Sequence, residues 1–199
     1  MSEQITVIPM DTSMMEAQEK ALIDTQIATA KAYPRNVVKA RDNIVTIVSM
    51  DAETAKSCGY SLPRAGSNIS GASVHLARIV AQQYGNLRTE MRVSQTDNTH
   101  VTGQAMCIDL ENNIGIRVEV KKRITNKTGQ RFNDDMITVT GLAAAATAFR
   151  NAVFNIVPKP LIDAGYKAAQ NTLIGDVSDE QKLLAKRKRT IDELSLIHI

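Results

Sequence analysis

The chain has 199 residues, of which 43% are hydrophobic and only 4% aromatic, and its net charge is +3. This length fits one domain with appendages, and the hydrophobic share is enough for a buried core. No run approaches the roughly 18 uninterrupted apolar residues of a membrane span, and the first residues lack the basic-then-apolar layout of a signal peptide. Cys58 and Cys107 lie in no CxxC motif. This excludes a zinc site and a disulfide framework, and indicates buried, reduced thiols in a cytoplasmic protein, with a single Cys58–Cys107 bridge as the less supported alternative.

Basic side chains are concentrated in the middle of the chain. Residues 1–57 carry 6 basic and 8 acidic side chains, residues 58–167 carry 13 and 8, and residues 168–199 carry 5 and 5. A polyanion is therefore expected to bind the middle segment.

Three helices are predicted in the acidic N-terminal segment, at 13–33, at about 36–49 and at 51–57. In the first helix, Ser13 and Glu16 have the spacing of a capping box, and Pro34 ends the helical pattern. We expect this segment to form a lid, a packing layer or an oligomer contact.

The middle of the chain is predicted to change from helix to strand. Residues 58–72 are rich in Gly, Pro, Ser and Asn and are predicted to form a loop, followed by a helix from about 72 to 84. Three strand-like runs follow at 87–95, about 101–110 and 115–125, with a turn at Asn112 and Asn113. Asn126 to Gly129 is a further turn that folds back towards Arg131 and Phe132.

A long helix is predicted at about 135–157, where the mostly small residues from Gly141 to Ala146 favour close packing on a sheet. A helix at about 160–174 and a charged helix from 176 follow. The predicted class is α+β: a three- to five-stranded, largely antiparallel sheet packed by the Ala-rich helix, with an N-terminal helical segment. The expected parts are 1–57 for that segment, 58–175 for the core, 176–193 for the start of a further helical domain and 194–199 for a tail.

The strand-like runs alternate between apolar and basic side chains. Because successive residues of a strand point to opposite faces, each run should present one apolar face and one basic face. If the runs share a sheet, its non-core face carries Arg88, Arg92, Arg117, Lys121 and Arg123. Such a face can hold a phosphodiester backbone. The spacing alone fits equally well with ordinary solvated strand faces on which Glu90 and Glu119 pair with the cations.

Other candidate residues are less specific. Arg150 interrupts the Ala-rich helix and is expected to contact a phosphate, or else to pair with Asp134 or Asp135. These two carboxylates suit a helix N-terminus, and with Asp109 they would make the metal site of a nuclease, although no spacing motif supports one.

Stacking and catalytic residues are scarce. Tyr60, Tyr84 and Phe132 are placed to stack on a base, but core packing is the more frequent role of each. His75 and His100 have no nucleophile pattern around them, and the chain has no P-loop. Neither catalytic residues nor a cofactor or metal is therefore indicated.

Two segments resemble a known family. They are GYSLPRAGSNISGASVHLARIVAQQYGNLRTEMRV and IGIRVEVKKRITNKTGQRFNDDMITVTGLAAAATAFRNAVFNIVPKPLIDAGY, and they cover most of residues 58–170. They look like phage-encoded proteins similar to the RecT/Redβ single-strand annealing recombinases. The helix ending in QQYGN resembles the helix-to-strand entry of the Redβ core, and the helix with FRNAVF resembles the long helix that lines the DNA groove.

The resemblance implies a non-catalytic, ATP-independent protein of the bacterial host cytoplasm. It would coat single-stranded DNA, form rings or filaments, and anneal complementary strands in phage recombination and repair. The implied DNA contacts are Arg64, Arg88, Arg92, Arg117, Lys121, Arg123, Arg150 and Lys159. The weak aromatic content and the compact N-terminal helices depart from the family pattern and leave the oligomer contacts open. The alternatives are a metal-dependent phage nuclease using Asp109, Asp134 and Asp135, and a phage structural or assembly protein whose basic face serves packing.

The C-terminal residues carry a separate expectation. The last six, Leu194 to Ile199, resemble the translation of a sequencing adapter, so the natural protein is expected to continue into a further helical domain. In the annealing family such a domain recruits host single-strand binding protein and a phage exonuclease. The basic run Lys186 to Arg189 is interpreted as a solvated helix face, with nucleic-acid binding as the alternative.

Overall fold

The structure is a computed structural model that describes residues 12–64, 67–175, 184, 187 and 188. The predicted helix from 176 and the tail from 194 lie almost wholly outside the described residues. In chain order the elements are α1 (Thr12–Ala32), α2 (Val37–Val48), α3 (Ala52–Ser57), β1 (Gly59–Arg64), β2 (Ser67–Ala72), α4 (Val74–Tyr84), β3 (Leu87–Thr96), β4 (His100–Asp109), β5 (Ile114–Arg123), α5 (Asp134–Ile156) and α6 (Lys159–Ile174). The α+β class is confirmed.

The main sheet is an antiparallel meander in the order β3-β4-β5. Its register sets Gly103 of β4 opposite Val93 of β3 and Val120 of β5. The turn into β5 contains Asn113, whose φ of 54° is one that asparagine tolerates better than most residues. The three predicted strands and the turn between the second and third are therefore confirmed.

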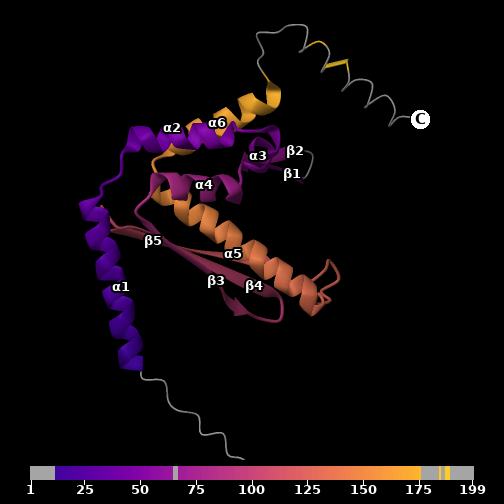
Figure 1. The fold of residues 1–199 in the computed structure, drawn as a ribbon. Helices are drawn as coiled ribbons and strands as arrows, with labels where there is room; N and C mark the ends of the chain where they lie inside the picture. Colours follow the sequence, from indigo (N-terminus) through magenta and orange to yellow (C-terminus); the bar gives the residue numbers. More distant parts are fainter. Residues whose placement is uncertain (1–11, 65–66, 176–183, 185–186, 189–199) are drawn as a thin grey trace, which may run out of the picture.

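The Ala-rich helix α5 covers one face of this sheet, above β4 in Figure 1. A Cβ atom added to Gly103 would lie 2.2 Å from the backbone N of Ala145, so the helix and strand backbones nearly touch. Ala144, Ala145 and Ala148 are buried at this contact because their small side chains let the helix lie flat on the sheet. The predicted close packing of this helix is confirmed.

α5 is also the one helix in the described ranges that is long and apolar enough to cross a membrane, by length and composition alone. A third of its most apolar window is buried inside the molecule. The core helix of a domain meets the same criteria, so this feature is weak evidence for a membrane span.

A second layer of helices lies on the far side of α5 from the sheet (Figure 1). α2 and α3 pack there with α4 and α6 around one continuous apolar core that includes Ile44, Leu76, Val80 and Val153. α2 and α6 approach so closely that a Cβ on Gly165 would lie 2.7 Å from Cγ2 of Ile44. Two of the three N-terminal helices therefore belong to the same core as the rest of the chain.

The helix α1 differs from these, because most of its side chains are exposed. It is attached through the buried Ala30, through hydrogen bonds from Arg88 to Glu19 and Gln26, and through the bond from Nδ2 of Asn86 to the carbonyl of Tyr33. Figure 1 shows it as an arm that runs away from the helical layer along the side of the sheet.

The loop predicted at 58–72 is wrong, because these residues form the β1–β2 hairpin with six cross-strand pairs, from Gly59–Ala72 to Arg64–Ser67. Turn-forming side chains do not prevent backbone pairing, and the base of the hairpin is fixed where the amide of Ser73 donates to the carbonyl of Cys58. Since this hairpin is separate from the meander, the main sheet has three strands, the lower end of the predicted range.

Cys58 and Cys107 are buried free thiols, as predicted. Burial raises the pKa of both thiols, and for Cys107, where the nearby charge of Asp109 adds to the effect, the pKa reaches about 11. Neither thiol is therefore expected to react readily in the folded protein.

Candidate nucleic-acid interface

The face of the sheet opposite α5, called the outer face below, gathers most of the predicted basic residues. Cross-strand partners point to the same side, so the register can be read as rows across the three strands. The rows are Glu90–Met106–Arg117, Arg92–Gln104–Glu119 and Gln95–Thr102–Lys121, with Arg88 opposite Ile108 at one end and Arg123 opposite His100 at the other. The predicted alternation is thus confirmed in β5 and in β3 as far as Val93, after which a bulge shifts the register and brings Gln95 to the outer face. The apolar side of β3 is only partly covered, because Met91 and Val93 remain exposed.

Positive charge on the outer face exceeds negative charge. Five cations, Arg88, Arg92, Arg117, Lys121 and Arg123, share it with two carboxylates, Glu90 and Glu119. Arg88 is compensated, since its guanidinium contacts Glu90 at 2.6 Å and Glu19 of α1 at 3.1 Å. This is the pairing with carboxylates that the alternative interpretation required, and it holds at this corner.

The other four cations have no carboxylate partner within the described part of the chain. Arg92 donates to the amide oxygen of Gln104, and Arg123 donates to the hydroxyl of Thr125. Arg117 reaches only the sulfur of Met106, at 3.9 Å. Glu119 is held by Gln104, whose amide donates to it at 2.8 Å. These cations keep their charge available for an external anion.

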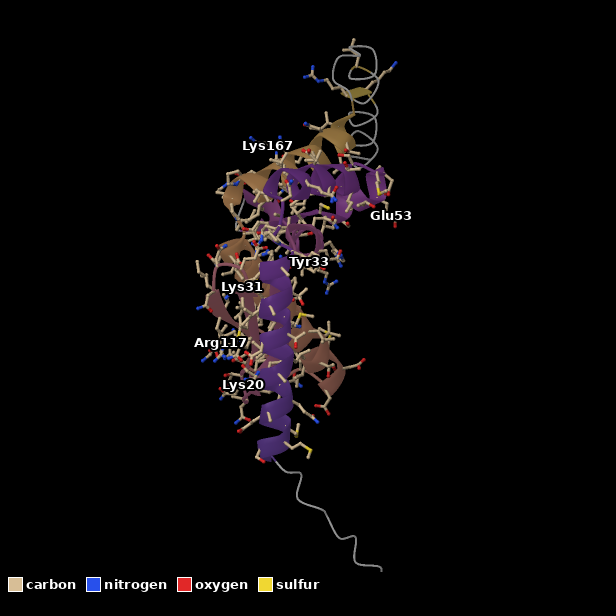
Figure 2. All side chains as sticks on the ribbon, turned by 60° about the vertical axis from the view of Figure 1, so that its left-hand side comes forward. Lys20, Lys31, Tyr33, Glu53, Arg117 and Lys167 are labelled. Carbon is tan, nitrogen blue, oxygen red and sulfur yellow. The ribbon has the colours of Figure 1, made fainter. Side chains whose placement is uncertain are left out.

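The centre of the outer face is hollowed. The hollow has a volume of about 390 Å³, and it is lined by Glu90, Met91, Arg92, Gln104, Ala105, Met106 and Arg117. In Figure 2, α1 stands in front of the sheet with Arg117 at its flank, in agreement with the bonds from Arg88 to α1. The outer face is therefore a shallow basic surface bordered at its Arg88 corner by a helix.

The three remaining predicted contacts are not on this face. Arg150 lies on α5, where its guanidinium is 5.2 Å from the ring centre of Tyr60 and donates to Asn151. Lys159 starts α6 and pairs with Asp163, and Arg64 ends β1, where its side chain is outside what the structure describes. The eight predicted contacts therefore do not form one surface, because α5 separates the outer face from the helical layer and the hairpin.

The other two residues predicted to stack, Tyr84 and Phe132, lie outside the three strands of the main sheet. Tyr84 is buried, and the guanidinium of Arg35 lies 4.0 Å from its ring centre. Phe132 follows a short antiparallel bridge between Thr125 and Arg131, which confirms the predicted return of the chain after Gly129.

A buried ionic cluster around Arg35 was not anticipated. Arg35 binds both carboxylate oxygens of Asp109, and its backbone N and Nε both donate to Glu111, at 2.9 and 2.8 Å. The side chains of Arg35 and Asp109 are 6% and 5% exposed. Arg35 follows Pro34 in the α1–α2 connection, and no spacing pattern links it to residues more than 70 positions away.

The charges in this cluster stabilise one another. Burial alone would raise the pKa of Asp109, but hydrogen bonds from Arg35 and Asn112 outweigh it and hold that pKa below its ordinary value. Glu111 behaves likewise, because hydrogen bonds from Asn86 and Arg35 lower its pKa against the effect of burial. The cluster is thus an ionised structural tie between the N-terminal helices and the β4–β5 turn.

The three carboxylates of the nuclease alternative do not meet. Asp109 is bound to Arg35 at the C-terminal end of β4, whereas Asp134 and Asp135 follow the Thr125–Arg131 bridge, which lies near the N-terminal end of β4. At ~3.3 Å per strand residue, the two ends of β4 are about 30 Å apart. Within the described ranges no three His, Cys, Asp or Glu side chains are grouped to hold a metal ion.

Comparison with known proteins yields no relative: no family model, no curated protein and no solved structure matches this chain.

Proposed function

We propose that this chain binds single-stranded DNA through its phosphates on the outer face of the β3–β4–β5 sheet. The observation that supports this most is the set of four cations, Arg92, Arg117, Lys121 and Arg123, that have no carboxylate partner in the described residues. Cations left unpaired on one face repel each other, and a phosphodiester backbone would relieve that repulsion.

The proposed activity is ATP-independent annealing. The cross-strand rows of the outer face contain no Phe, Tyr or Trp, and their one imidazole, His100, lies at the Arg123 end, so the surface offers charge and hydrogen bonds rather than a stacking platform. A protein that holds phosphates leaves base edges free to pair with a second strand. The rest of the proposal, a cytoplasmic, non-catalytic recombination protein that forms rings or filaments, is what the resemblance of the two segments within residues 58–170 to the RecT/Redβ group implies.

The primary test is a filter-binding titration with labelled single-stranded DNA at several salt concentrations. We expect affinity to fall steeply as salt rises, with no requirement for ATP or magnesium, and we expect complementary strands to anneal faster with the protein than without it. No binding at low salt, or an affinity independent of salt, would sink the proposal.

Removing three of the outer-face cations should weaken binding to all sequences alike. In the variant Arg117→Ala/Lys121→Ala/Arg123→Ala, the slope of log affinity against log salt should become shallower by about 2, because each lost phosphate contact on a single strand removes ~0.7.

A matched control is Lys39→Ala/Arg41→Ala/Arg78→Ala, which changes the net charge equally but at exposed positions of α2 and α4 in the helical layer. It should keep the wild-type slope. Equal slopes for the two folded triple variants would mean that the outer face is not where the phosphates bind.

A further inference from the structure

A second hollow lies in the helical layer, between α3, the β1–β2 hairpin and α6. Its volume is about 410 Å³, within the range of small-ligand pockets. Tyr60, Tyr166, Ala169 and Leu173 supply apolar walls, and Lys56 and Gln170 supply polar groups. Figure 1 shows these elements together above α5, whereas the sheet lies below it, so this pocket is separate from the outer face.

A glycine of the hairpin, Gly71, makes room for the ring of Tyr60, and Gly59 lies at ordinary contact distance from Tyr166. A Cβ on Gly59 would lie 3.6 Å from Cε2 of Tyr166, and a Cβ on Gly71, directly across from Tyr60, would lie 3.0 Å from the Tyr60 hydroxyl. A larger residue at position 71 would push the Tyr60 ring away. The backbone of the hairpin therefore packs tightly against the Tyr60 ring and lies beside the Tyr166 ring at the pocket.

This concentration of aromatic side chains is unusual for the chain, which has four tyrosines, three phenylalanines and no tryptophan. Two of the four tyrosines meet at this one pocket. Positive charge is present as well, since Lys56 lines the pocket and the guanidinium of Arg150 lies over the ring of Tyr60. Aromatic rings beside cations form the usual environment of a nucleobase and its phosphate in proteins that bind single strands.

We infer that this pocket binds a nucleobase of single-stranded DNA, with the base against the tyrosine rings and the adjoining phosphate near Lys56. The inference rests on the proposed function. It adds a contact to a base, whereas the outer face is proposed to contact only phosphates. It also gives Arg150 a role away from the outer face, as the residue that positions the Tyr60 ring.

The test compares an oligothymidylate with an abasic strand of the same length by fluorescence anisotropy. The thymidylate should bind roughly 5- to 100-fold more tightly, the gain typical of stacking one base on an aromatic side chain. This difference should shrink in Tyr166→Leu, where only the Tyr60 ring remains, and return in Tyr166→Phe, which restores the second ring. A matched control is Tyr33→Leu, because Tyr33 lies outside the pocket and is 76% exposed, and it should keep the difference.

A second measurement needs no variant. A strand carrying photoreactive bromouracil should crosslink to Tyr60 or Tyr166, as located by peptide mass spectrometry, and an excess of plain oligothymidylate should suppress the crosslink. Crosslinks found only elsewhere, or an undiminished base preference in folded Tyr166→Leu, overturn the inference.

The two proposals fail differently. If the abasic and thymidylate strands bind equally and both respond to salt, the base pocket is refuted and the phosphate face stands. If neither strand binds, both proposals are refuted.

Discussion

Replacing Gly103 by alanine should destabilise the protein by about 3 kcal/mol or more, a large effect for the addition of one methyl group. The added Cβ would lie 2.2 Å from the backbone N of Ala145 and 2.3 Å from the carbonyl carbon of Ala144. Backbone atoms cannot rotate away as a side chain can, so α5 would have to lift from the sheet. Urea denaturation followed by circular dichroism would measure the loss.

The matched control for this variant is Gly115→Ala. Gly115 is on β5, and a Cβ there would meet only Cγ1 of Ile108, at an ordinary 3.5 Å. Both substitutions add the same methyl group to a strand, so the control should change stability by less than about 1 kcal/mol. If Gly103→Ala were as mild as Gly115→Ala, the close contact between α5 and β4 would be wrong.

Replacing Arg35 by methionine should cost about 3–5 kcal/mol at neutral pH. The variant keeps much of the side-chain volume but leaves the Asp109 carboxylate buried without its cation. Urea denaturation followed by circular dichroism would measure this loss in the free energy of unfolding. The tie between the α1–α2 connection and the β4–β5 turn is lost as well, because Glu111 also binds Arg35.

The contribution of Asp109 to the pH dependence of stability should have opposite signs in the wild type and in Arg35→Met. In the wild type the pKa of Asp109 is lowered, so its stabilising contribution is present above the ordinary value of 3.8 and is lost as pH falls through the lowered value. In Arg35→Met, burial without the cation should raise that pKa, so acidification removes an unfavourable charge. The stability gap between the two proteins should therefore narrow between neutral pH and about pH 4.

The double variant Arg35→Met/Asp109→Asn separates lost contacts from buried charge. Asparagine at 109 still accepts hydrogen bonds from the backbone amides of Glu111 and Asn112 but carries no charge. It should recover at least about 1 kcal/mol relative to Arg35→Met. Two results together would show that the cluster does not act through charge: a double variant no more stable than Arg35→Met, and a stability difference between the wild type and Arg35→Met that does not change with pH.

Features that depend on local periodicity could be predicted from the sequence. The alternation around Arg88 to Arg92 and Arg117 to Arg123 was enough to put these cations on one face, because side-chain direction in a strand follows a period of two residues. The run of small residues after Gly141 likewise predicted that the helix packs closely on the sheet, and the structure places this contact at β4.

Features that depend on distant pairing could not be predicted. Arg150 was expected to contact a phosphate from the helix or to pair with Asp134 or Asp135, but its guanidinium lies over Tyr60 and donates to Asn151. The side to which a helical residue turns relative to the sheet is not contained in the local pattern. Arg35 and Asp109 meet across 74 positions, and the hairpin at 59–72 is made by backbone pairing that its turn-rich composition concealed. Two tyrosines meeting at one pocket depend in the same way on α6 packing beside β1.

The central claim, that a single strand lies on the outer face, is tested most directly by cysteine footprinting. Because Cys58 and Cys107 are buried and their thiol pKa values are raised, an introduced surface cysteine should be the one that reacts with an alkylating reagent. Glu119→Cys places the reporter between Arg117 and Lys121, and Val139→Cys places a control on the exposed side of α5. Single-stranded DNA should slow alkylation at position 119 and leave position 139 unaffected, and high salt should abolish that protection. Equal alkylation at 119 with and without bound DNA, or protection at 139 instead, would contradict the account.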